Sequence, residues 1–398
     1  MNRCVKVCFW TTTFQADVLA LARYMCKDER FEPLVVVADR AGFLLQPIQK
    51  LLPVSCQLLE KNAPDTIPRV RDFAPHVTIV DNQFPKKKLS PKLFVLWHGF
   101  GWKGPNDIRE FSRIHKRIKR LSGASAMEPN ENFIWQCFGP TDLEHRNAVS
   151  GFARENLRSL GAAFTDELLS GSISREQALQ QHPELLGAKR VGLIALTWHY
   201  GRALSHWGED IALLKRLFDH MAERQCAPIL RMHDRKRFEP AYLLELERLV
   251  ANYPEAVIKF KDEARDSLLD LVASDFIISN FSSILNYYYA TRKPSIHVYP
   301  VAAANEAFLW RRWRRGKVRV KKIPSADYVW KLPPEQNGGL LARSFDEMLA
   351  AVDRALDAPH CCREASDTFI ERHMAPVDGQ SCERICRAVV ELSSSGTG

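Results

Sequence analysis

Short apolar runs alternate along the chain with longer segments in which apolar residues recur every three or four positions. This alternation is typical of βαβ units and so of parallel sheets. In the first half, strands are predicted at Val5–Trp10, Leu34–Ala38, Val77–Val80 and Leu93–Trp97. In the second half, they are predicted at Val191–Trp198, Pro228–Met232, Val257–Phe260, Phe276–Ser279 and Ser295–Tyr299. The clearest helices are expected at Ala16–Cys26, Glu209–Arg224 and Phe345–Leu356.

The two series of strands predict an α/β protein with two doubly wound, Rossmann-like domains in tandem. A length of 398 residues favours two domains, because a single core of that size is unusual. A polar stretch around Leu169–Lys189 separates the two series, so we expect domains at 1–175 and 188–398. Ligands of doubly wound folds bind beyond the carboxyl ends of the strands, which places the expected ligand in a cleft between the domains.

The net charge of +9 has a local origin. The segment Trp310–Lys322 contains eight basic residues and no acidic one, and the rest of the chain is nearly neutral. Clustered arginines next to tryptophans suit an anionic membrane surface. The predicted membrane-contact residues are Trp310, Arg311, Arg312, Trp313, Arg314 and Arg315. A solvated loop or a pair of strands with charged outer faces is the alternative.

The ten cysteines show no paired C-x-x-C spacing, so a structural zinc site is not expected. They suit buried thiols of a reducing cytosol. No uncharged apolar run reaches the roughly 18 residues of a membrane span, and the apolar run at the N-terminus is too short for a signal peptide.

Polar side chains follow four of the predicted strands. His98 opens a glycine-rich loop that continues through Gly99 and Lys103, and His233 follows the strand that ends with Arg231 and Met232. The other two groups are Thr197-Trp198 and Ser279-Asn280-Phe281-Ser282-Ser283. Histidines at these places can act as general bases, and serines at the start of a helix can bind phosphate. Turn capping, helix capping and core packing are the structural alternatives for the same residues.

Six blocks of sequence, taken in order, resemble the CDP-glycerol glycerophosphotransferase family of teichoic-acid primases and polymerases. They are LWHGFGWKG, GAAFTDELL, ALTWHY, RMHD, SDFIISNFSSILNYYYATRKPSIHVYP and DGQSCERI. The resemblance implies a GT-B-type fold, with two doubly wound Rossmann-like domains facing across a cleft. The first would be the acceptor-side domain and the second the nucleotide-donor-binding domain with closing C-terminal helices.

The same resemblance implies transfer of glycerol phosphate, or a related alditol phosphate, from a CDP-activated donor to a hydroxyl of a cell-surface glycan or lipid-linked acceptor. CMP would be released. His98 would be the general base, and His233 would stabilise charge on the pyrophosphate or protonate the leaving CMP. The implied donor-binding residues are Thr197, Trp198, Ser279, Asn280, Ser282, Ser283, Asp378 and Gly379. Gly99, Lys103 and Arg231 would bind the acceptor or its phosphate.

Three departures from the family pattern lie beside the expected donor site. Asn280 and Asn286 replace aspartates, and Asp234 replaces a proline. The loss of two carboxylates suggests a different donor, so a GT-B glycosyltransferase that uses a nucleotide sugar in capsule or lipopolysaccharide synthesis is the alternative. The sequence itself requires no cofactor, although a divalent cation is compatible with the donor. The expected setting is cytoplasmic, peripheral to the inner face of the cell membrane, with no nucleic acid as partner.

Overall fold

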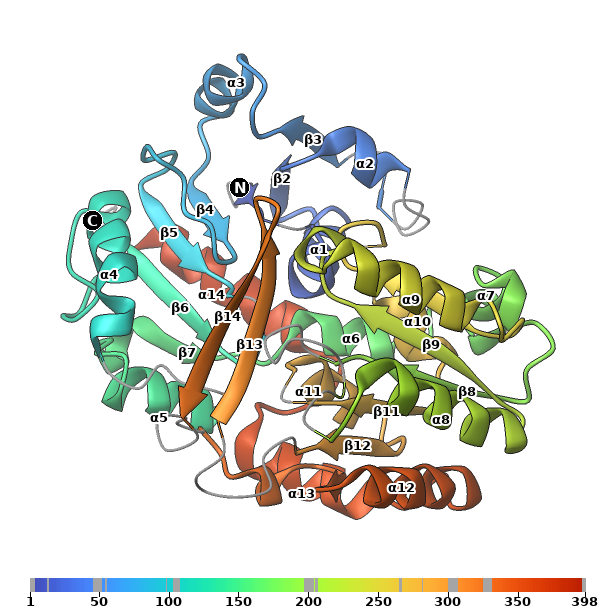
Figure 1. Cartoon of the computed structure of the whole chain (residues 1–398). Coiled ribbons are helices and arrows are strands. Elements are labelled where there is room, and N and C mark those ends of the chain that lie inside the picture. Colours follow the sequence, from blue (N-terminus) through green and yellow to red (C-terminus); the bar gives the residue numbers. More distant parts are fainter. Residues whose placement is uncertain are drawn as a thin grey trace. The chain divides into compact units, whose positions relative to one another are not determined.

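A computed structural model describes residues 4–12, 14–45, 52–53, 56–97, 99–102, 108–196, 204, 207–264, 267–280, 282–299, 307–324 and 331–395 (Figure 1). The chain divides into two compact units. The first unit consists of Met1–Phe100, Pro105–Ser170 and Glu371–Gly398, and the second of Gly101–Gly104 and Gly171–Ile370. The chain therefore passes between the units more than once, which a simple division into an N-terminal and a C-terminal half did not anticipate.

The first unit is built on a parallel seven-stranded sheet of order β3-β2-β1-β4-β5-β6-β7. Its strands are β1 (Val5–Trp10), β2 (Phe31–Val37), β3 (Gln57–Glu60), β4 (Val77–Val80), β5 (Lys92–Val95), β6 (Phe133–Cys137) and β7 (Leu157–Ser159). Its helices are α1 (Ala16–Met25), α2 (Arg40–Leu44), α3 (Thr66–Phe73), α4 (Ile108–Ser122), α5 (Pro140–Ala148), α6 (Ala163–Leu169) and α14 (Ser381–Ser394). The strand order reverses between β1 and β4, as in doubly wound folds.

The second unit repeats this plan with a parallel six-stranded sheet of order β10-β9-β8-β11-β12-β15. Its strands are β8 (Arg190–Ile194), β9 (Cys226–Met232), β10 (Val257–Phe260), β11 (Phe276–Ser279), β12 (Ser295–Val298) and β15 (Leu340–Ala342). Its helices are α7 (Arg175–Leu179), α8 (Asp210–Glu223), α9 (Pro240–Val250), α10 (Leu268–Ala273), α11 (Ile284–Tyr289) and α12 (Phe345–Asp357), and α13 (Arg363–His373) spans the boundary of the units. The predicted strands and helices of both series are confirmed, with ends that differ by a few residues.

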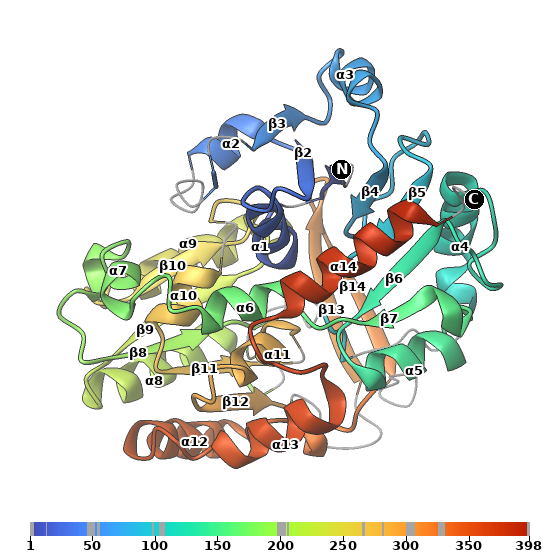
Figure 2. The same cartoon turned by 180° about the vertical axis from the view of Figure 1, so that it is seen from behind.

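The C-terminal helix corrects our prediction that residues 188–398 form one domain. α14 belongs to the first unit, where it packs on β4, β5, β6, α1 and α6. Figure 2 shows α14 lying across the strands of the first sheet. The physical reason is its apolar face, which buries Ile385, Val389 and Leu392. The sequence shows that this face exists, but it does not show which sheet the face covers.

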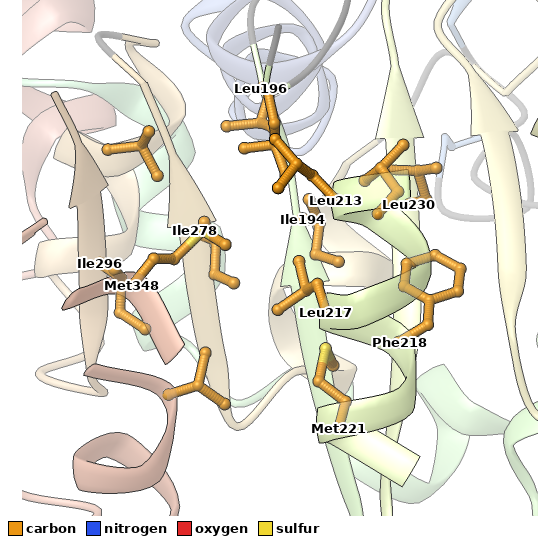
Figure 3. Close-up of a cluster of buried hydrophobic side chains, with 14 of the residues drawn as sticks. Ile194, Leu196, Leu213, Leu217, Phe218, Met221, Leu230, Ile278, Ile296 and Met348 are labelled. Atoms are coloured by element: carbon orange, nitrogen blue, oxygen red, sulfur yellow. The ribbon is translucent and has the colours of Figure 1, made fainter. Parts of the chain in front are cut away.

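The core of the second unit lies between the sheet and the helices α8 and α12. Glu209 begins α8 by accepting a hydrogen bond from the backbone N–H of Ala212 (2.7 Å). The helix then buries Leu217, Phe218 and Met221 at helical spacing, and Figure 3 shows these side chains beside Ile194, Leu230 and Ile278 of the sheet. This core holds the strands whose carboxyl ends carry the candidate site.

No helix in the described ranges combines the length and the apolar character needed to cross a membrane. None of the ten cysteines forms a disulfide, and most of them are buried.

Candidate functional site

The second sheet gathers most of the predicted site residues at one edge. β9, β8, β11 and β12 are consecutive neighbours, and all of them run parallel. His233 follows β9 directly, and Asn280 follows β11. Thr197 and Trp198 come three and four residues after the end of β8 but lie outside the described residues. Because parallel strands end at the same edge, these motifs belong to one side of the sheet, where doubly wound folds bind their ligands.

The serine motif at the end of β11 divides into structural and exposed members. The Ser279 hydroxyl is fully buried and donates a hydrogen bond to the carbonyl of Ala195 (2.6 Å), which ties β11 to the end of β8. Asn280 is buried immediately after the strand. Ser282 and Ser283 are half-buried, and Ser283 occupies the N-cap of α11 without a side-chain hydrogen bond to the helix. Among the three serines, Ser282 and Ser283 are therefore more accessible to a ligand than Ser279.

His233 sits beside an acidic and a basic side chain. Its Nδ1 accepts a hydrogen bond from the backbone N–H of Asp234 (2.7 Å) and lies 3.4 Å from the Asp234 carboxylate. Arg237 donates to the same carboxylate from Nε (2.7 Å). Burial lowers the pKa of His233 below its usual value, and this outweighs the opposite effect of Asp234. His233 is thus held through Nδ1 by Asp234 at the carboxyl end of β9.

The block LWHGFGWKG, which contains His98, follows β5 in the first unit. His98 and Lys103 lie outside the described residues, but their neighbours are defined. Trp97 has a left-handed backbone (φ 54°) and packs its ring on Trp135 at 4.8 Å. Gly99 also has a positive φ (109°), a conformation that a residue with a side chain rarely adopts. The backbone therefore bends on both sides of His98.

Gly99, Gly101 and Gly104 have the G-x-G-x-x-G spacing of nucleotide-binding loops, a motif that the sequence-based prediction wrongly took to be absent. Glycines at this spacing let a backbone approach a phosphate closely.

Trp102, which follows in the same loop, belongs to the second unit. It is fully buried, and its ring centroid lies 4.9 Å from that of His297, nearly perpendicular to it, and 5.5 Å from that of Phe369. Its carbonyl accepts a hydrogen bond from the backbone N–H of Lys331 (2.8 Å). His297 lies on β12 directly opposite Ser279 of β11, and burial lowers its pKa to about 3. Trp102 is thus held against β12, the strand next to the serine motif.

The sequence-based prediction did not select Trp102 or His297. A tryptophan between closely spaced glycines and a histidine in the middle of an apolar strand were the available signals.

Arg231, which was predicted to bind the acceptor or its phosphate, already pairs with a carboxylate inside the second unit. Its guanidinium is buried and pairs with the carboxylate of Asp270 (Nη1 to Oδ2, 2.7 Å). Lys259, its register partner on β10, binds the other oxygen of that carboxylate at 2.6 Å. Although burial raises the pKa of Asp270, the neighbouring cations hold it well below its usual range. Arg231 therefore balances a buried charge behind the sheet edge.

Asp378 and Gly379 were predicted to bind the donor in the second domain, but they belong to the first unit. The Asp378 carboxylate accepts two hydrogen bonds from Nη1 of Arg384 (2.9 and 2.8 Å), which helps hold its pKa below the usual value despite the opposing effect of burial. Gly379 has a φ of 75° in the turn before α14. These residues start a helix.

The start of α14 is stabilised by another of the six blocks that resemble the family. Asp166, in the block GAAFTDELL, accepts hydrogen bonds from the backbone N–H groups of Ser381 (3.1 Å) and Cys382 (2.7 Å) in the block DGQSCERI. A carboxylate at a helix N-terminus satisfies donors that have no partner within the helix. The two blocks therefore contact each other at the N-terminus of α14.

The basic segment forms a hairpin of β13 (Ala307–Arg314) and β14 (Lys317–Pro324). This matches the pair of strands considered as the alternative to a membrane contact. Arg314 and Arg315 are exposed and Trp313 is half-buried, whereas the side chains of Trp310, Arg311 and Arg312 lie outside the described ones. Arg315 and Gly316 both have positive φ, as a tight two-residue hairpin turn requires.

In the part of the chain that the structure describes, no three histidine, cysteine or acidic side chains converge as metal ligands would.

Comparisons with known proteins agree with this architecture. No family model matches the chain, and no curated protein matches it in sequence. Among solved structures, a variant of the wall teichoic acid polymerase TagF superposes with a TM-score of 0.68 over 98% of this chain and 88% of its own, at 13% identity. The chain has the fold of TagF.

A second TagF structure, soaked with CDPG, matches with a TM-score of 0.67 over 96% of this chain and 87% of its own, at 14% identity. The UDP complex of MnaA from S. aureus matches with a TM-score of 0.57 over 97% of this chain and 96% of its own, at 12% identity. The fold is therefore GT-B, as predicted, and a likeness at this identity establishes the fold alone.

Proposed function

We propose that the chain is a transferase that moves an alditol phosphate, with glycerol phosphate as the first candidate, from a CDP-activated donor to a hydroxyl of a glycan or lipid-linked acceptor. The observation that carries this proposal is the gathering of motifs at one sheet edge. His233, Asn280 and the Trp102–His297 contact follow or lie on three of the four neighbouring strands β9, β8, β11 and β12. Support comes from the fold shared with TagF, which has been solved with CDPG.

In this mechanism the acceptor oxygen attacks the β-phosphorus of the donor. The bond from that phosphorus to the bridging oxygen breaks, the bridging oxygen leaves with CMP, and the hydroxyl proton passes to His98. His233 stabilises the charge that develops on the pyrophosphate or protonates the leaving CMP, with its ring oriented by Asp234.

Ser282 and Ser283 would bind the donor phosphates, with Thr197 and Trp198 completing this pocket. Gly99 and Lys103 would face the acceptor. The proposal gives Arg231 and Asp378 structural roles instead, because each pairs with a charged side chain of its own unit, and it leaves Gly379 as part of the turn before α14.

The substitution His98→Ala tests the assignment of the base. General-base catalysis contributes about 10²- to 10⁴-fold, so CMP release should fall by at least about 10²-fold while the melting temperature stays unchanged. His360→Ala is the matched control, because His360 is an exposed histidine far along the chain from both motifs. Near-normal turnover by folded His98→Ala protein would overturn the role of His98.

A second candidate function is sugar transfer from a nucleotide sugar. Two observations favour it: Asn280 stands where the family has an aspartate, and the UDP complex of MnaA shares the fold. The released nucleotide separates the two functions, because a CDP-alditol donor yields CMP and a UDP-sugar donor yields UDP or UMP.

The lipid-linked form of the acceptor would place the protein at the inner face of the cell membrane, with an anionic membrane surface as a predicted partner. A divalent cation would act, if at all, by bridging the donor pyrophosphate. Assays with EDTA and with added Mg²⁺ test the expectation that the chain itself requires no metal.

A further inference from the structure

A cavity of about 240 Å³ lies in the second unit, at the edge of the sheet opposite to the candidate site. Arg190 begins β8, Asp275 directly precedes β11, and Lys293 lies two residues before β12; all three line the cavity. Because these strands run parallel, their amino ends meet at one edge of the sheet, and their carboxyl ends, where the serine motif lies, meet at the other. The cavity is therefore separate from the residues proposed for the reaction.

The charged part of the cavity wall contains more cations than carboxylates. Its described lining has one acidic side chain, Asp275, and four lysine or arginine side chains, Arg190, Arg292, Lys293 and Arg363. Oδ2 of Asp275 accepts hydrogen bonds from Nη2 of Arg175 (3.0 Å) and from a backbone N–H (2.8 Å), and its Oδ1 lies 3.8 Å from Arg190. Arg292 donates from Nε to the carboxylate of Asp367 (2.8 Å). Both of these carboxylates therefore already have cationic partners.

The other two cations of the wall lack a carboxylate partner. Within the described chain, no ion pair involves Lys293 or Arg363. The ammonium of Lys293 donates hydrogen bonds to the carbonyls of Ser274 (2.7 Å) and Val272 (3.3 Å), which leaves one of its three N–H groups for a ligand. Burial is the largest influence on the pKa of Lys293 and holds it below its usual value. A bound anion would supply the counter-ion that this half-buried ammonium lacks.

Arg363 adds a geometry suited to phosphate. It is the first residue of α13, where the helix carries partial positive charge, and its side chain is exposed. A planar guanidinium can bind two oxygens of one phosphate group. Together, Lys293 and Arg363 match the two negative charges that a phosphate monoester approaches near neutral pH.

The remaining lining and the size of the cavity indicate what the phosphate is attached to. Ala355 and Leu356 of α12, together with Pro359, give the cavity an apolar part. Its volume lies below the roughly 300–1,000 Å³ of pockets that hold drug-sized ligands, which favours a ligand smaller than a nucleotide. Free phosphate would leave the apolar part uncovered, whereas a phosphate ester with a short carbon chain would contact both parts.

We propose that this cavity binds a small phosphomonoester, with its phosphate at Lys293 and Arg363 and its carbon chain against Leu356 and Pro359. The site does not depend on the proposed function, because it uses none of the residues assigned to the reaction. A ligand that binds only the folded chain stabilises it, so an occupied cavity would stabilise the second unit.

The test measures binding of propyl phosphate to the full chain by isothermal titration calorimetry at constant ionic strength, with inorganic phosphate as the comparison ligand. The variants are Lys293→Gln and Arg363→Gln. The matched control is Arg354→Gln, which removes the same charge from an exposed arginine of α12 that does not line the cavity. Melting temperatures show which variants are folded. Arg363→Gln decides the outcome if Lys293→Gln does not fold, because the Arg363 side chain is exposed.

The unmodified chain should bind propyl phosphate saturably and more tightly than inorganic phosphate. Loss of one charged hydrogen bond should raise the Kd about tenfold or more in Lys293→Gln and Arg363→Gln, while Arg354→Gln should stay within about twofold. The proposal is overturned by an absence of saturable binding or by inorganic phosphate binding at least as tightly. An unchanged Kd in folded Arg363→Gln, or an equal loss of affinity in Arg354→Gln, would also overturn it.

Discussion

The buried position of Trp102 leads to a prediction about catalysis at a distance from the reacting atoms. Its side chain is fully buried against His297 and Phe369 in the second unit, and it follows His98 by four residues in the same loop. Replacing a buried tryptophan with alanine costs about 3–5 kcal/mol. If this free energy holds the loop in place, Trp102→Ala should shift the loop toward undocked states by about 10²-fold or more, at 1.4 kcal/mol for each factor of ten.

Trp102→Phe keeps a ring against His297 and loses on the order of 1 kcal/mol, so it should lower kcat by about tenfold or less. The assay is the steady-state rate of CMP release, with kcat and donor KM measured separately. The loss should fall mainly on kcat. Phe218→Ala is the matched control, because Phe218 is equally buried in the same unit but belongs to the core under α8.

Phe218→Ala should lower the melting temperature and leave kcat near normal at temperatures where the protein is folded. The reasoning fails if Trp102→Ala retains a kcat within about twofold of the unmodified chain. It also fails if Phe218→Ala lowers kcat as much as Trp102→Ala does, since the loss would then follow from reduced stability.

Three further predictions concern the buried Asp270 and the histidines His297 and His233. Asp270→Asn leaves Arg231 and Lys259 without their buried carboxylate and should cost about 3–5 kcal/mol in urea unfolding; a loss below about 1 kcal/mol would contradict the buried ion pair. Burial lowers the pKa of His297 to about 3 in the folded chain, against 6.5 when it is unfolded. The free energy of unfolding should therefore be highest above pH 6.5 and should fall by up to about 1.4 kcal/mol per pH unit toward pH 3, because protons bind the unfolded chain first. The substitution His297→Phe should remove this slope. His233→Ala should lower kcat by about 10²-fold, the usual loss for one hydrogen bond to developing charge, and unchanged kinetics would exclude it from the site.

The local sequence was sufficient to predict the ends of three short strands. Val77–Val80, Val257–Phe260 and Phe276–Ser279 have the predicted ends, because a polar or charged residue follows each of them directly. β13 and β14 were harder to predict, because arginine and lysine on both strands hide the alternation of polar and apolar residues that is typical of a hairpin. β15 has only three residues, too few for a period to show.

Long-range pairing explains which contacts of the predicted site residues the sequence does not reveal. Arg231 follows a pattern suited to ligand binding, but its partner Asp270 is 39 residues away, and the sequence contains no sign that they meet. Asp378 was carried to the donor site by resemblance, although α14 returns the chain to the first unit. The serine motif and His233 were placed correctly at strand ends because topology alone fixes which edge they share.

The identity of the released nucleotide tests the central claim most directly. Purified protein is incubated with CDP-glycerol, CDP-ribitol, UDP-sugars or GDP-sugars and a membrane extract as acceptor, and the nucleotides are separated and quantified. The account predicts CMP from a CDP-alditol, in an amount that depends on the acceptor and disappears with His98→Ala. Release of UDP or UMP from a UDP-sugar, with no CMP from either CDP-alditol, would contradict it.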